Sequence, residues 1–99
     1  ELTYDEATVS MINTAQTLCE QAQFHVSEGN NDIKNKDFDE AQVHFKTALN
    51  LYNLASRNLM STIPRLEKKE VSELVQIESE IGDLQQKIEE VDKILQYKK

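Results

Sequence analysis

Three pairs of small residues, placed symmetrically about residue 35, are the feature that most constrains the fold of this chain. The pairs are Ala15 with Ala55, Ala22 with Ala48, and Gly29 with Ala41. On each side of the centre the small residues recur every seven positions, so they form one stripe along a helix. The residues between the two stripes, 34–37, are polar and suited to a turn. Small side chains let two helices approach closely, so the sequence predicts a tight antiparallel helical hairpin centred on residue 35.

The composition favours helix throughout the chain. Its 99 residues include only 2 glycines and 1 proline, whereas β-rich and loop-rich folds need many such residues at their turns. Good helix formers are abundant, and a chain of this length makes one domain. We therefore expect residues 1–99 to form a single all-α domain. Because the chain starts at Glu1 without a methionine, we expect it to be a fragment or processed product of a larger protein.

Capping signals predict three long helices, over residues 3–34, 37–62 and 64–97. Thr3 begins a capping-box sequence, and Asp37 has a side chain that can cap the second helix. Pro64 lacks a backbone N–H and therefore ends the second helix, but it fits the first turn of a third helix capped by Ser61 or Thr62. The alternative at this proline is one kinked, continuous helix.

Residues 74–95 carry the clearest apolar pattern, with spacings that alternate between three and four. Its members are Leu74, Ile77, Ile81, Leu84, Ile88, Val91 and Leu95. So narrow a stripe fits a single groove, and we expect the third helix to lie in the groove along the hairpin as an antiparallel up-down-up bundle. The same heptads also suit a coiled coil between chains. We favour the monomeric bundle, because the apolar face of the hairpin needs another helix to bury it.

The stretch from Ala22 to Ala48 resembles one tetratricopeptide repeat. The residues at that motif's spacing for two packed helices are Gly29, Ala41, Phe45 and Ala48. His25 and Asp32 occupy positions where the motif has large or aromatic residues, and Asn53 occupies the position where the motif ends with a proline. No second copy follows, whereas a solenoid needs about three repeats. A repeat array is therefore not expected.

A single hairpin with a third helix is more similar to the microtubule-interacting and trafficking (MIT) domain. The matching residues are Ala41, Ala48 and Ala55, which lie seven residues apart and follow directly after the Lys-Asp-Phe-Asp-Glu sequence of residues 36–40. The resemblance implies a three-helix bundle that binds short, often helical peptides in grooves beside its third helix. Many members of that family act in endosomal sorting.

The charge of the chain limits the classes of partner. A net charge of −7 opposes binding to nucleic acid and to anionic membrane surfaces, and no apolar run of about 18 residues predicts a membrane span. A protein partner with a basic or amphipathic helix fits this charge best. Cys19 is the only cysteine, which favours a reducing compartment such as the cytoplasm, although a secreted helical domain needs no disulfide either.

Residues able to perform chemistry are few. His25 and His44 are nearly equidistant from the hairpin centre, so they should lie near each other and could hold a metal with Glu28 or Glu40. No third ligand is well spaced, and we expect ordinary hydrogen bonds and no metal site. Cys19 lies beside the small-residue stripe of the first helix, at the edge of the predicted core, and is expected to be an inert buried thiol. We therefore predict that the chain has no cofactor and is not an enzyme.

Phe24 is the residue most suggestive of a partner surface. It falls outside the apolar stripe of the first helix, on the face opposite the predicted hairpin contact, and Val9 and Val43 are milder cases of the same kind. We expect a non-catalytic protein–protein interaction module that binds a helical or extended peptide in a groove between helices. The alternative is a structural helical spacer or coiled-coil assembly domain of a larger or surface-exposed protein, which would self-associate through its third helix.

Overall fold

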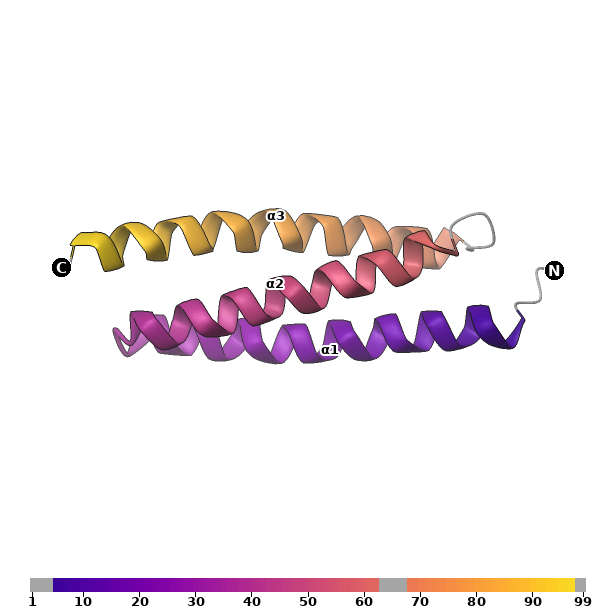
Figure 1. Ribbon diagram of the computed structural model, residues 1–99, viewed down its shortest axis with the longest axis horizontal. Helices are drawn as coiled ribbons and strands as arrows, with labels where there is room; N and C mark the ends of the chain where they lie inside the picture. The colour runs from indigo at the N-terminus through magenta and orange to yellow at the C-terminus, as the bar shows by residue number, and fades with distance from the viewer. Residues whose placement is uncertain (1–4, 63–67, 98–99) are drawn as a thin grey trace.

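Three long helices make up the fold. A computed structural model describes residues 5–62 and 68–97, which form α1 (Glu6–Lys34), α2 (Phe38–Met60) and α3 (Lys68–Tyr97). Successive helices run in opposite directions and form a rod of 56 × 17 × 16 Å (Figure 1). The predicted all-α, up-down-up bundle is confirmed, and the described residues contain no strand.

The start of α1 differs from the prediction. The Asp5 carboxylate accepts a hydrogen bond of 2.8 Å from the backbone N–H of Thr8, so Asp5 is the N-cap and the helix begins at Glu6. Thr3, the predicted cap, lies outside the described residues. An aspartate two residues further along already satisfies a free N–H group at the helix start, and the helix begins after it.

The turn after α1 satisfies the last carbonyls of that helix. The N–H of Lys36 donates to the carbonyl of Ile33 (3.0 Å), and the N–H of Asp37 donates to the carbonyl of Asp32 (2.8 Å). These two bonds are those of a Schellman motif, in which Lys36 takes the left-handed conformation with φ 61°. The chain reverses here, as predicted. Asp37 is the N-cap of α2, as predicted, but its side chain makes no capping hydrogen bond.

The end of α2 also differs in its capping. The hydroxyl of Ser61 donates to the carbonyl of Asn58 (2.8 Å), and that of Thr62 donates to the carbonyl of Leu59 (2.9 Å). These side chains, predicted to cap the third helix, therefore satisfy carbonyls of the second, whose last residue is Met60. Pro64 and the predicted start of the third helix lie outside the described residues.

The small-residue stripes form the contact between α1 and α2. All six predicted residues are buried: Ala15, Ala22, Gly29, Ala41, Ala48 and Ala55. At Gly29 the approach is so close that an added Cβ would lie 2.6 Å from Cε1 of Phe45. The predicted tight antiparallel hairpin is therefore confirmed.

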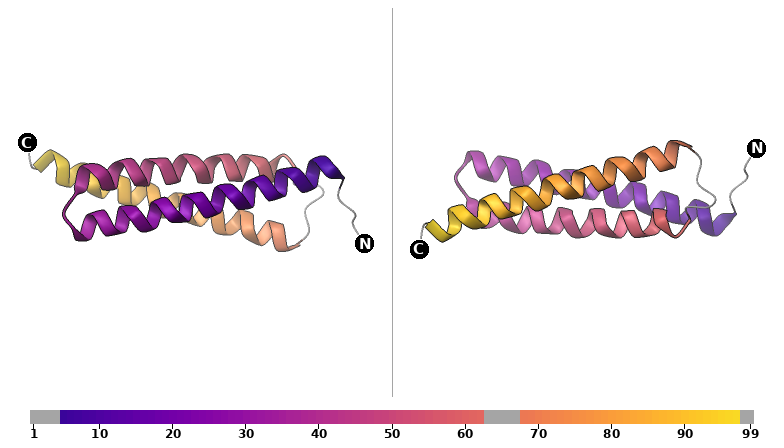
Figure 2. Two further views of the ribbon diagram at one scale, coloured as in Figure 1. Left: turned by 90° about the horizontal axis from the view of Figure 1, so that it is seen from below. Right: turned by 90° about the horizontal axis from the view of Figure 1, so that it is seen from above.

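The third helix packs mainly on α2. Figure 1 shows α2 between the other two helices, and Figure 2 shows α3 running obliquely across the hairpin. Gln42 of α2 donates to the Ile88 carbonyl (3.1 Å) and to the Asp92 carboxylate, and the Ser56 hydroxyl donates to the Glu78 carboxylate (2.7 Å). The prediction that this helix fills the groove along both partners therefore needs correction.

The sequence of α1 explains this displacement. Its side facing α3 carries polar residues, which offer little apolar area for α3 to bury: Gln16, Glu20, Gln23, Ser27 and Asn30. By contrast, α2 presents large apolar residues such as Tyr52 and Leu59, both of which are buried. Burial of apolar area favours packing on α2, and the two outer helices remain partly separated.

Candidate functional site

A groove between α1 and α3 is one of the concave surfaces formed by the described residues. It has a volume of about 580 Å³, and its floor is formed by Tyr52 and Leu59 of α2. The groove follows from the packing above, because α1 and α3 both contact α2 but contact each other only lightly. At one end the two outer helices are joined, where Lys87 Nζ donates a hydrogen bond of 3.1 Å to Asn30 Oδ1.

The lining of the groove combines an apolar floor with an acidic rim. The apolar members are Ala15, Cys19, Val26, Tyr52, Leu59 and Ile77. The charged members are Glu20 from α1 and Glu73 and Glu80 from α3, and no lysine or arginine lines the groove among the described residues. A surface of this kind matches a ligand with an apolar face flanked by positive charges.

Two ionisable groups that line the groove have raised pKa values, chiefly because they are buried. Burial raises the pKa of the Cys19 thiol above its ordinary value, and Glu73 and Glu20 raise it further. Burial likewise raises the pKa of Tyr52 to about 12, with Glu80 as the next cause. A thiol kept protonated is a poor nucleophile. The contributions of Glu73, Glu20 and Glu80 to these pKa shifts have the sign expected of an acidic rim.

The three residues predicted to bind a partner are exposed but lie outside this groove. Their exposed fractions are 58% for Phe24, 41% for Val9 and 59% for Val43. Phe24 lies beside Thr47 and Leu51 of α2 in a shallow pocket. It is therefore at the lateral edge of the hairpin and not on the opposite face. Val9 lies in a different hollow, which is lined by residues of α1, and the role of the three residues in binding stays a prediction.

The two histidines meet as the hairpin geometry predicts. Nδ1 of His25 lies 3.0 Å from Nδ1 of His44, at hydrogen-bond distance, and the rings are tilted by 32°. Nε2 of His44 lies 3.7 Å from Oδ2 of Asp32. Sequence reasoning named Glu28 and Glu40 as the neighbouring carboxylates and missed Asp32, although Asp32 follows His25 by two helical turns on the same face of α1. Within the described ranges no cluster of three or more His, Cys, Asp or Glu residues forms a ready metal site.

Comparison with known proteins returned no match among protein-family models, curated proteins or solved structures. The chain is therefore classified by its own architecture, an antiparallel three-helix bundle with a groove between its outer helices. A search of the described helices for one long and apolar enough to cross a membrane found none.

Proposed function

We propose that this chain is a non-catalytic protein-interaction module that binds a basic amphipathic helix of a partner protein in the α1–α3 groove. One observation carries the proposal: the apolar floor of the groove is flanked by glutamates from both outer helices, and no lysine or arginine of residues 5–62 and 68–97 lines it. The chain as a whole also carries a net negative charge of −7. Such a field steers a basic partner toward the site and speeds association.

The length of the groove suits a docked helix. From Ala15 to Asn30, the lining residues of α1 span about 22 Å at the rise of an α-helix, or roughly four turns. A helix laid along this line would place apolar side chains at i, i+3 or i+4 and i+7 on the floor. Lysine or arginine at its flanking positions would lie near Glu20, Glu73 and Glu80. The resemblance to the MIT domain agrees with this mode, since that family binds peptides in grooves beside its third helix.

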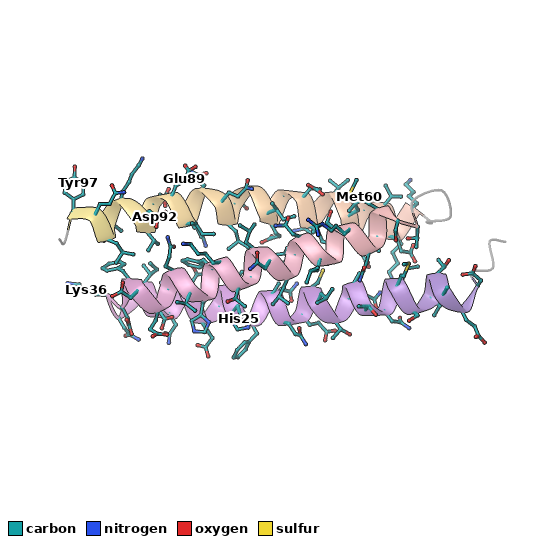
Figure 3. All side chains as sticks on the ribbon, viewed as in Figure 1. His25, Lys36, Met60, Glu89, Asp92 and Tyr97 are labelled. Atoms are coloured by element: carbon teal, nitrogen blue, oxygen red, sulfur yellow. The ribbon has the colours of Figure 1, made fainter. Side chains whose placement is uncertain are left out.

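The test compares two charge reversals on the same helix. Glu80 lines the groove, whereas Glu89 points away from the hairpin on the outer side of α3 (Figure 3). The probe is a fluorescent amphipathic peptide of about three leucine–lysine heptads, titrated at physiological ionic strength to limit non-specific attraction. We expect Glu80→Lys to weaken binding roughly tenfold, equal to about 1.4 kcal/mol, and Glu89→Lys to weaken it much less.

A steric variant makes the test independent of charge. Ser27 is an exposed residue of the groove wall, so Ser27→Trp should fill the groove and reduce peptide binding without loss of helical circular dichroism. Equal effects of Glu80→Lys and Glu89→Lys, together with no effect of Ser27→Trp, would show that the peptide binds by diffuse attraction. The proposal would then be rejected.

A structural spacer or assembly domain is the second candidate function. One observation favours it: Val71 and Val75 lie one turn apart on α3, and 41% and 65% of their surfaces are exposed. Met60, at the end of α2, is 54% exposed. Apolar residues of this kind could bury one another between copies of the chain. A concentration-dependent mass in solution would favour this function.

A further inference from the structure

We propose that His25 and His44 form a two-histidine site for a divalent transition-metal ion of the Zn²⁺, Ni²⁺ or Cu²⁺ kind. The site joins α1 to α2 at the edge of the hairpin, and His25 is seen there on the side turned away from α3 (Figure 3). The proposal revises the expectation from sequence that the pair makes ordinary hydrogen bonds only. It is independent of the groove, whose lining includes neither histidine.

The separation of the two nitrogens fits the proposal. Metal–nitrogen bonds to histidine are about 2.0–2.1 Å long, so two ligands of a tetrahedral ion lie about 3.3 Å apart, and adjacent ligands of a square-planar ion about 2.9 Å apart. The observed distance between the two Nδ1 atoms is 3.0 Å. The rings must turn outward so that both lone pairs converge on the ion. Their positions allow this, because both histidines are only partly buried.

The protons balance when the ion binds. In the hydrogen bond between the rings, one Nδ1 carries the proton and the other accepts it. For the ion to take a lone pair from each Nδ1, the donor ring must change tautomer: it loses the Nδ1 proton to solvent and takes up one proton at Nε2. Each neutral ring then carries one proton, on Nε2, and no net proton is released.

Asp32 supplies the second observation. Oδ2 of Asp32 is buried and has no hydrogen-bond partner, and it lies 3.7 Å from Nε2 of His44. Histidines that bind metals usually donate their other ring N–H to a carboxylate, which fixes the tautomer and the ring orientation. Asp32 is placed to accept this proton from His44, which leaves Nδ1 free for the ion. Its negative charge also partly compensates the charge of the bound metal.

Solvent can complete the coordination of the ion. The shallow pocket beside His25 has a volume of about 390 Å³ and is lined by Phe24 and Thr47 among others. The Phe24 ring stands edge-on to the His25 ring, with centroids 5.4 Å apart. With two protein ligands, the remaining positions would be filled by water. Imidazole nitrogen suits Zn²⁺, Ni²⁺ and Cu²⁺ among the common divalent ions.

The experiment measures thermal unfolding with Ni²⁺, with Zn²⁺ and with EDTA. A ligand that binds only the folded hairpin raises the midpoint as its concentration increases. We expect this rise in the parent chain and in Cys19→Ser, and its loss in His25→Gln and His44→Gln. Asp32→Asn should weaken the affinity roughly 10- to 100-fold, measured by calorimetric titration with Ni²⁺, while its midpoint in EDTA stays near that of the parent.

Two further measurements keep the test decisive. Midpoints in EDTA establish that the histidine variants fold, and peptide binding to the groove should be unchanged in them. The spectrum of bound Cu²⁺ should show two nitrogen ligands, which are lost when both histidines are replaced. Equal metal-induced shifts in the parent and in a His25→Gln/His44→Gln double variant would overturn the proposal, as would the absence of any shift in the parent.

Discussion

Gly29 and Gly82 both lie inside helices, but their surroundings differ completely. At Gly29 an added Cβ would stand 2.6 Å and 2.8 Å from two atoms of the Phe45 ring, whereas at Gly82 it would meet nothing within 4 Å. Phe45 is only 1% exposed and is therefore held by its neighbours. Gly29 allows this close approach of the two helices, and Gly82 has no such constraint.

We expect Gly29→Ala and Gly82→Ala to change stability in opposite directions. Alanine gains about 1 kcal/mol of helix propensity at either position, but overpacking against a fixed ring costs about 1–3 kcal/mol. Gly29→Ala should therefore lower the free energy of unfolding by about 1 kcal/mol net, and Gly82→Ala should raise it by about 0.5–1 kcal/mol. Urea unfolding followed by circular dichroism measures both changes. An equal gain in the two variants would mean that α1 and α2 do not meet as described.

Cys19 and Tyr52 predict how stability responds to alkaline pH. The folded chain holds both protons more tightly than the unfolded chain, since burial raises the pKa of Cys19 above 9.0 and that of Tyr52 from 10.0 to about 12. Where the folded state binds more protons, stability falls as pH rises. Their contribution is thus complete below pH 9.0 and is lost progressively up to about pH 12. Thermal midpoints across this range should fall less steeply in a Cys19→Ala/Tyr52→Phe variant; parallel curves would contradict the assignment.

At the scale of the element, the turn between α1 and α2 has an unusual residue at its key position. Lys36 has φ 61°, a conformation that glycine adopts without cost but that costs other residues about 1–2 kcal/mol. The hydrogen bonds of the Schellman motif hold it there. The hairpin therefore contains a strained residue at its bend.

Lys36→Gly should stabilise the chain. Relief of the left-handed strain exceeds the added backbone entropy of glycine in the unfolded state, for a net gain of roughly 0.5–1 kcal/mol. Lys34→Gly is the matched control, because Lys34 is the last residue of α1 and glycine there should reduce stability. Both variants lose one lysine, so their difference in thermal midpoint isolates the backbone effect. A fall in the midpoint of Lys36→Gly would show that this turn adopts another conformation in solution.

At the scale of the whole molecule, the fold is a rod and not a sphere. The Cα radius of gyration is 15.8 Å, whereas a compact domain of about 100 residues has a value near 13 Å. The apolar stripe of α3 faces α2 within the same chain, and Leu74, Ile77 and Leu84 are buried there. A coiled coil between chains would use these same residues.

We expect light scattering at micromolar concentration to give the monomer mass of 11.4 kDa. X-ray scattering should give a radius of gyration slightly above 15.8 Å and the distance distribution of a rod. The physical reason is that the heptads of α3 are already buried on α2 and cannot serve a second partner at the same time. A mass of twice this value or more, at all concentrations, would instead support assembly through α3 or through its exposed valines.

The sequence determined the parts of the structure that depend on spacing along one helix. The stripes of small residues predict the hairpin and the register of its two helices. The positions of His25 and His44 predict that these two residues lie close together. The apolar period of residues 74–95 predicts a third helix with one buried face. Helix ends were less predictable, because Asp5 is as good a capping residue as Thr3, and only the hydrogen bond from the Thr8 N–H identifies Asp5 as the N-cap.

The position of α3 was decided only by the tertiary structure, and with it the groove. A narrow apolar stripe fits either the groove along the hairpin or the surface of α2 alone. Which of the two positions α3 takes depends on the total apolar area buried along all three helices. The meeting of His44 with Asp32 likewise depends on how two helices are placed across the hairpin. Periodicity tells which face of a helix is buried, but the crossing angle and the neighbour follow from packing between segments far apart in the chain.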